Sequence, residues 1–189
     1  MAGNRQSMVF DQASRPFALY LHWPFCRAKC PYCDFNSHVS NDVDSKIFGD
    51  ALCTEMTHMA SLMPSRPPLS SLFFGGGTPS LFSAQAIAAI LDGAQQRLAF
   101  ESDCEITLEA NPGTVEQARF DGYRAAGVNR LSIGVQSFNG TKLEKLGRIH
   151  TANEAIKAAE AARRAGFENF NLDLMFALPS QTVAEAIED

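Results

Sequence analysis

Three cysteines stand close together near the start of the sequence, where Cys26, Cys30 and Cys33 form a C-x3-C-x2-C pattern. Thiolates spaced in this way can reach one metal centre, and soft sulfur ligands favour zinc or an iron-sulfur cluster over magnesium or calcium. Structural zinc takes four protein ligands, and His22 and His38 are the nearby candidates for a fourth. A [4Fe-4S] cluster on three cysteines leaves one iron open to another ligand. The spacing favours the cluster, with a zinc site and unliganded core thiols as alternatives.

The composition narrows the class of protein. The 189 residues are 46% hydrophobic and 20% charged, which is typical of a globular domain with one core. A net charge of -5 leaves no overall basic surplus for phosphate backbones, so we expect no nucleic-acid partner. Residues 1–17 lack the apolar core of a secretory signal, and no later stretch is apolar enough to span a bilayer. We therefore expect a cytoplasmic protein without a transmembrane segment, and structural roles for its other cysteines, Cys53 and Cys104.

The elements that position the cysteines follow from the hydrophobic pattern. Helix-like stretches separate five strand-like runs, and this alternation predicts an α/β fold with a parallel sheet and helices outside it. Five such units suggest most of a (β/α) barrel, with a tail at residues 1–16 and a core domain at 17–189. The strand-like runs lie at about 17–24, 70–75, 104–110, 128–136 and 167–176.

Start and stop signals mark several of the helices between these runs. Three Thr residues stand at capping-box spacing before a Glu or Gln, and two glycines follow helical stretches as C-terminal caps. The pairs are Thr114 with Gln117, Thr151 with Glu154 and Thr182 with Glu185, and the glycines are Gly127 and Gly166.

Each predicted strand sorts into an apolar and a polar set of side chains. A structural parallel sheet is apolar on both faces, and a buried carboxylate is costly without a partner, so the polar face predicts a ligand cavity. Glu109 and Gln136 fall late in their strands, where active sites of β/α barrels gather. The polar set is Tyr20, His22, Ser71, Thr107, Glu109, Ser132, Gly134, Gln136, Asn171 and Asp173; the apolar set is Leu19, Leu21, Trp23, Leu72, Phe74, Ile106, Leu108, Ala110, Leu131, Ile133, Val135, Phe170, Leu172, Leu174 and Phe176.

A run of three glycines ends the second predicted strand, in Gly75-Gly76-Gly77-Thr78-Pro79. Without side chains, its backbone can approach a ligand and offer N–H and C=O groups. A tight turn is the alternative interpretation. The run lacks the G-x-G-x-x-G spacing of a dinucleotide site.

These motifs together resemble the radical S-adenosylmethionine (SAM) enzymes, from about residue 17 to the C-terminus. The resemblance rests on Tyr20-Leu21-His22-Trp23-Pro24-Phe25-Cys26 with the cysteine pattern, and on Gly75-Gly76-Gly77-Thr78-Pro79. Within that family the chain is most similar to the oxygen-independent coproporphyrinogen III oxidase-like group, through three further motifs. These are Cys33-Asp34-Phe35-Asn36-Ser37, Leu108-Glu109-Ala110-Asn111-Pro112 and Gly134-Val135-Gln136-Ser137-Phe138.

The resemblance implies a partial (β/α) barrel and a [4Fe-4S] cluster on Cys26, Cys30 and Cys33. In the family the open iron binds the amino and carboxylate groups of SAM, and an electron from the cluster cleaves the sulfonium to give a 5'-deoxyadenosyl radical. An electron donor such as a flavodoxin or ferredoxin is implied as well. No catalytic residue is assigned beyond the cluster.

Matched position by position, Tyr20, Gly76 and Glu109 resemble contacts to the SAM at the cluster, with Glu109 accepting hydrogen bonds from ribose hydroxyls. Five more residues match contacts to a second SAM in the oxidase. For Arg148 the alternative is a solvated charge at a helix end, and for Gln136 and Asp173 it is a structural role. The five are Gly77, Thr78, Gln136, Arg148 and Asp173.

One position departs from the oxidase pattern, because Phe35 stands where its fourth motif cysteine would be. The segment instead resembles the haem chaperone branch of the group, HemW, and so implies haem or porphyrin and a haem-acceptor protein as partners in tetrapyrrole metabolism. The alternatives are a true oxidase and, less favoured, a zinc-stabilised binding module. The family pattern also predicts a sixth unit and a C-terminal domain after the five units present here.

Overall fold

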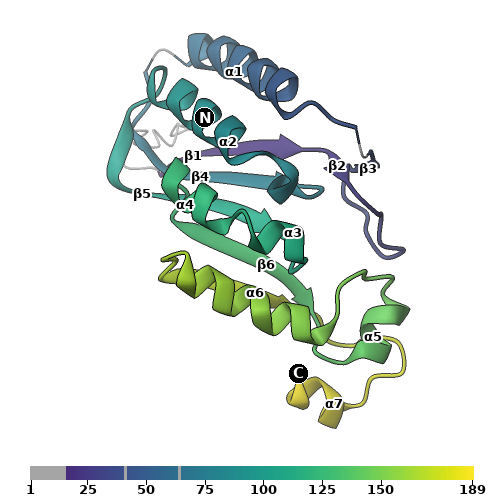
Figure 1. The fold of residues 1–189 in the computed structure, drawn as a ribbon. Helices are drawn as coiled ribbons and strands as arrows, with labels where there is room; N and C mark the ends of the chain where they lie inside the picture. Colours follow the sequence, from purple (N-terminus) through teal and green to yellow (C-terminus); the bar gives the residue numbers. More distant parts are fainter. Residues whose placement is uncertain (1–15, 41, 64) are drawn as a thin grey trace, which may run out of the picture.

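The computed structural model describes residues 16–40, 42–63 and 65–189. The tail predicted at residues 1–16 therefore lies outside the described residues except for Pro16. Figure 1 shows a twisted sheet whose strands run in one direction, with helices stacked along one of its faces.

Five parallel strands form the main sheet in the order β1-β4-β5-β6-β7. Because every pair is parallel, the carboxyl ends of all five meet at one edge. In Figure 1 this is the side where β2 (Phe25–Cys26) and β3 (His38–Val39) lie. The predicted α/β fold and partial (β/α) barrel are confirmed. The strands are β1 (Phe17–Trp23), β4 (Leu69–Gly76), β5 (Phe100–Ala110), β6 (Arg130–Gln136) and β7 (Asn169–Leu174).

The helices begin and end largely where the sequence signals predict. Thr151 and Thr182 each close a capping box with the Glu three residues later, and Gly127 ends a helix in the left-handed conformation, with a φ of 110°. Thr114 is the first residue of its helix, and its side chain lies outside what the structure describes. The elements are α1 (Ser45–Leu62), the 3-10 turn η2 (Pro79–Leu81), α2 (Ala84–Gln95), α3 (Thr114–Gln117), α4 (Phe120–Ala126), α5 (Gly140–Lys145), α6 (Ala152–Arg164) and α7 (Val183–Glu188).

The core lies between the sheet and the helices on its apolar face. The apolar side chains predicted for the middle strands are buried there, with Leu72, Leu108 and Leu131 at 0% exposure. Helix α2 contributes Ile87 and Ile90, and α6 packs with small residues. Two residues of the predicted apolar set, at the end of the edge strand, are not buried. Leu174 is 46% exposed, and Phe176 lies beyond the end of β7 and is 82% exposed.

The opposite face of the sheet carries the predicted polar set. Its side chains bond largely to one another, since Arg130 donates to Asn171, and Asn171 Nδ2 donates to Ser132 Oγ over 3.1 Å. Ser132 Oγ in turn lies 3.0 and 3.1 Å from the two oxygens of Asp173. This polar row leads across β6 and β7 toward the carboxyl edge.

A loop at that edge is closed by a short parallel pair, β2 (Phe25–Cys26) and β3 (His38–Val39). The backbone N–H of His38 donates to Pro24 O over 2.7 Å, and that of Ser40 donates to Cys26 O over 3.0 Å. The loop between them thus starts and ends beside β1. Across the described ranges, no helix combines the length and apolarity needed to cross a membrane.

Candidate functional site

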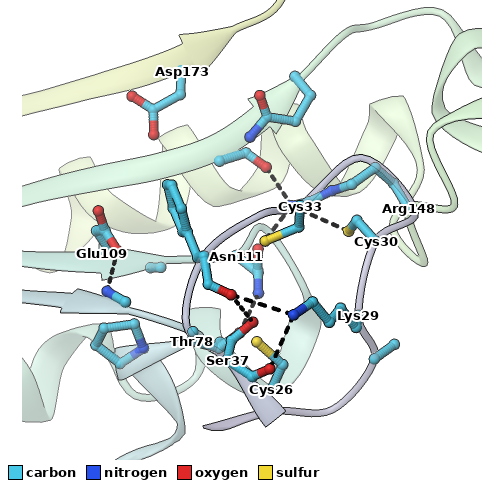
Figure 2. Close-up of a pocket in the computed structure, with 18 of the residues that line it drawn as sticks. Cys26, Lys29, Cys30, Cys33, Ser37, Thr78, Glu109, Asn111, Arg148 and Asp173 are labelled. Carbon is cyan, nitrogen blue, oxygen red and sulfur yellow. Dashed lines mark hydrogen bonds between the residues drawn. The ribbon is translucent and has the colours of Figure 1, made fainter. Parts of the chain in front are cut away.

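Cys26 is the last residue of β2, and Cys30 and Cys33 lie on the segment that leads from it to β3. Residues 26–37 are here called the cysteine loop. Cys26 is buried, whereas Cys30 and Cys33 are half-buried. A turn joins the last two, because the N–H of Cys33 donates to Cys30 O over 3.0 Å. The Lys29 ammonium fixes the rest of the loop by donating to the carbonyls of Phe35 and Ser37 over 3.3 and 3.1 Å (Figure 2).

A pocket of about 400 Å³ lies between the cysteine loop and the carboxyl ends of β5, β6 and β7, and the end of β4 forms part of its wall. Figure 2 shows the cysteines on one side of it and Glu109 and Asp173 on the other. The structure therefore brings together the predicted metal ligands and all but one of the predicted SAM contacts. Lining the pocket are Cys26, Cys30, Cys33, Gly76, Gly77, Thr78, Glu109, Gln136, Arg148 and Asp173.

Tyr20 is the predicted contact that does not line this pocket. Its side chain is 55% exposed, and its ring stacks on Phe73 with the centroids 6.1 Å apart. The Tyr20 hydroxyl lies 3.1 Å from His22 Nδ1, and His22 Nε2 lies 2.9 Å from Asn36 O. Tyr20 is thus linked to the cysteine loop through His22.

The glycine run packs directly against the start of the cysteine loop. A Cβ on Gly77 would lie 2.5 Å from Phe25 O and 2.9 Å from Cys26 Sγ, so a side chain there has no room. The N–H groups of Gly77 and Thr78 donate to Trp23 O and Phe25 O over 2.6 and 2.8 Å. The expectation that this run offers free N–H groups is therefore wrong for these two residues, whose N–H groups anchor the loop.

Glu109 occupies the end of β5 on the polar face, as the strand alternation predicts. Its Oε2 accepts a hydrogen bond from the N–H of Gly76 over 3.0 Å, which joins β5 to β4. Burial raises the pKa of the Glu109 carboxyl above its usual value; the Gly76 bond opposes the rise, and the charge of Asp173 adds to it. This half-buried carboxylate has acceptor capacity left for hydroxyl groups of a ligand.

Arg148 lies in the pocket wall, so its interpretation as a solvated helix-end charge is wrong. Its Nη2 donates to Asn111 Oδ1 over 2.7 Å and to Gly134 O over 2.6 Å. Its Nη1 lies 3.6 Å from Cys30 Sγ (Figure 2). The guanidinium therefore connects the ends of β5 and β6 to the cysteine loop.

Gln136 and Asp173 complete the far wall. Gln136 has a φ of 69°, a left-handed conformation that costs roughly 1–3 kcal/mol for a residue other than glycine. Such strain often occurs at binding sites, and here it ends β6 beside the pocket. Asp173 accepts hydrogen bonds from Ser132 and Asn171, which hold its carboxylate at the pocket edge.

Sequence reasoning missed Asn111 as a member of the site. It stands two residues after Glu109, so the strand alternation continued past the end of β5 places it on the same face. Its Nδ2 donates to Thr78 Oγ1 over 3.2 Å while its Oδ1 holds Arg148. That alternation was the available signal.

The remaining histidines and cysteines do not line this pocket. Among the described residues, no three His, Cys, Asp or Glu side chains form a group that could hold a single metal ion. This includes the three motif cysteines, which line one pocket but are not grouped as ligands of one ion. His150 is buried with its Nε2 3.0 Å from Val135 O, and burial lowers its pKa to about 4. Cys104 belongs to the core and Cys53 packs against it; burial raises the pKa of both thiols.

Comparisons with known proteins match this arrangement. The sequence profile of the Radical SAM superfamily covers residues 20–189. The chain is 49% identical over 179 residues to the heme chaperone HemW of Haemophilus influenzae and 49% identical over 175 residues to that of Escherichia coli. In both cases 92% of this chain aligns with 46% of the relative, so the chain spans a little under half of their length.

A solved structure agrees with the fold. That of coproporphyrinogen III oxidase (HemN) from Escherichia coli, which is described as a radical SAM enzyme, superimposes with a TM-score of 0.81 at 34% identity. The match covers 92% of this chain and 40% of HemN. Together with the profile match over most of the chain, it confirms the resemblance expected from the motifs: the chain belongs to the radical SAM superfamily.

Proposed function

We propose that this chain is the part of a HemW-like haem chaperone that binds a [4Fe-4S] cluster and SAM. The observation that carries the proposal is the shared pocket, in which three thiols of one loop face a polar wall at the carboxyl edge of a parallel sheet. The 49% identity to proteins named heme chaperone HemW supports the haem chaperone over other members of the superfamily.

The donor set fits a cluster with an open iron. Three thiolates are soft ligands, and three of them satisfy all but one iron of a [4Fe-4S] cube. Of the two candidate fourth ligands for zinc, His22 has both ring nitrogens within hydrogen-bond distance of Tyr20 and Asn36, and His38 belongs to no group among the described residues that could hold a metal ion. A cluster held by Cys26, Cys30 and Cys33 would supply the electron, received from an external donor, for reductive cleavage of SAM.

The pocket wall supplies the binding groups for SAM. Glu109 accepts hydrogen bonds from the ribose hydroxyls, and the backbone of Gly76 beside it can approach the ligand closely because this residue has no side chain. Tyr20 on β1 lies outside the pocket, so its contact with SAM would be made at the pocket's rim, beside His22. A second SAM would contact the residues around Arg148, namely Gly77, Thr78, Gln136, Arg148 and Asp173.

The haem function belongs to the whole protein rather than to this pocket. By analogy with the relatives, which are named heme chaperones, the proposed partners are haem or porphyrin and a haem-acceptor protein. The proposed electron donor to the cluster is a flavodoxin or ferredoxin. The test is haem binding and transfer by the full-length protein that contains this chain. Absence of haem binding by that protein would count against the chaperone.

The cluster is tested by anaerobic reconstitution with iron and sulfide, followed by metal and acid-labile sulfide analysis. The wild-type chain is expected to become brown and oxygen-sensitive, and Cys26→Ala, Cys30→Ala or Cys33→Ala should each abolish the cluster. Cys53→Ala and Cys104→Ala are the matched controls and should retain it. Stoichiometric zinc without sulfide in the wild-type protein would instead support the zinc-stabilised module.

A second candidate function is oxygen-independent coproporphyrinogen III oxidase, which the likeness to HemN favours. Phe35 at the position of the fourth motif cysteine argues against it, and the Phe35 side chain is 57% exposed on the cysteine loop. Product analysis of the full-length protein under anaerobic conditions with coproporphyrinogen III, SAM and reductant separates the two. Formation of protoporphyrinogen IX would establish the oxidase.

A further inference from the structure

The segment that carries Arg148 is packed against the cysteine loop. Gly147 has a φ of 67°, and a Cβ there would lie 2.7 Å from Cδ of Pro31, which stands between Cys30 and Cys33. A residue with a side chain would both strain the backbone and push the loop away. The turn after α5 is thus built to place Arg148 beside the thiols.

The Arg148 guanidinium is held at one end, which leaves the other directed at sulfur. Asn111 Oδ1 and Gly134 O both accept from Nη2, at 2.7 and 2.6 Å. Asn111 is itself fixed, because its Nδ2 donates to Thr78, whose side chain is buried. Nη1 then points to Cys30 Sγ at 3.6 Å, within hydrogen-bond distance for a sulfur acceptor.

The positive charge of Arg148 is not neutralised by an ion pair. Over the described ranges, no carboxylate oxygen lies within 4.0 Å of its nitrogens, and its buried Nε has no hydrogen-bond partner. A full, partly buried positive charge therefore lies beside one predicted cluster ligand.

We propose that Arg148 raises the reduction potential of the cluster through its hydrogen bond to Cys30, and that Asn111 is the positioning residue for this bond. The inference rests on the proposed cluster. Reduction adds one electron from a low-potential one-electron donor, without making or breaking a bond, and so makes the cluster one unit more negative. A charged N–H donor at a ligating sulfur stabilises that reduced state more than the oxidised one.

The test is a redox titration of the reconstituted protein without SAM, using dithionite, mediator dyes and electron paramagnetic resonance. Arg148→Gln is expected to lower the equilibrium constant for reduction about tenfold, which is 59 mV for one electron. Asn111→Ala keeps the Arg148 guanidinium but removes the Asn111 Oδ1 acceptor that positions it. The cluster potential of this variant should therefore fall, but by less than that of Arg148→Gln. Leaving SAM out separates this effect from any contact between Arg148 and SAM.

Arg164→Gln is the matched control, because it removes the same charge from a side chain on α6 that is 70% exposed. Its potential should equal that of the wild type. If Arg148→Gln or Asn111→Ala holds a full cluster at the wild-type potential, the inference is wrong while the proposed cluster stands. If Arg148→Gln fails to hold a cluster, the potential of Asn111→Ala is the test, and a value equal to that of the wild type contradicts the inference. A wild-type protein without iron and sulfide contradicts the proposed function itself.

Discussion

The two faces of the five-stranded sheet are made from neighbouring residues of the same strands, yet they differ in what surrounds them. Leu108 and Leu131 are fully buried against the helices, whereas the next residues along the chain, Glu109 and Ser132, belong to the polar face. On the helix face, contacts are between apolar side chains. On the opposite, polar face, which is here called the open face, polar side chains form hydrogen bonds with one another and with backbone groups, and several of them line the pocket.

Because the two faces differ in this way, we expect the helix face to determine mainly the stability of the fold and the open face to determine mainly ligand binding. Apolar burial on the helix face supplies the driving force for folding, and it does not depend on the pocket. The open face holds groups that are costly to bury without a partner, and these are the groups suited to contact a polar ligand. A substitution on one face should therefore change mainly one of the two properties.

The largest effect on stability is expected from Leu108→Ala on the helix face. It removes a fully buried side chain from the central strand, so we expect the free energy of unfolding to fall by about 2–5 kcal/mol. Ser132→Ala, on the open face of the neighbouring strand, removes hydroxyl bonds to Asp173 and should cost about 1 kcal/mol. Urea denaturation measures both; equal losses would refute the division between the faces.

The next effect concerns ligand affinity. Glu109→Ala should leave the fold and cluster intact but weaken SAM binding by roughly 1.5–3 kcal/mol, or about 10- to 150-fold, because a charged acceptor is lost from the pocket. Glu105→Ala is the control: it changes the same strand face, but at an exposed residue outside the pocket. Calorimetry on a SAM-binding preparation measures the difference, and unchanged affinity in Glu109→Ala would remove this residue from the site.

Much of this fold was predictable because its signals are local. Period-two alternation identified both faces of β5 and β6, and the boxes of Thr151 and Thr182 fixed the start of α6 and α7. The cysteine motif and the late position of Glu109 likewise indicated the pocket. What was not predictable depends on contacts between distant segments, such as Gly147 against Pro31, the Arg148 bond to Asn111 and the use of the glycine N–H groups to anchor the loop.

Gly77→Ala tests how closely the edge of the open face is fitted to the cysteine loop. A methyl group would meet Phe25 O and Cys26 Sγ at less than 3 Å, and overpacking of this kind costs roughly 1–3 kcal/mol. We expect the iron and sulfide content after reconstitution to fall well below that of the wild type. Gly140→Ala is the control, since a Cβ there meets nothing within 4 Å. Full cluster content in Gly77→Ala would show that the loop moves aside without loss.

The last effect is a pH dependence of stability, and it comes from the buried titratable residue His150. His150 bonds to Val135 O, and burial holds its pKa at about 4, below the unfolded value of about 6.5. Because the unfolded chain binds the proton more tightly, the stability contributed by neutral His150 is complete above pH 6.5 and is lost as the pH falls toward 4.

Between pH 7.5 and 5.5 this linkage should lower the free energy of unfolding by about 1.4 kcal/mol. His150→Gln keeps an N–H donor for Val135 O but cannot titrate, so its stability should fall less over the same range by that amount. Denaturant unfolding of both proteins at the two pH values gives the change in the free energy of unfolding for each. The contributions of the other ionisable groups are the same in both proteins and cancel when the two changes are subtracted. Identical pH dependence would mean that His150 takes up a proton in the folded state as readily as in the unfolded chain, so that burial does not lower its pKa.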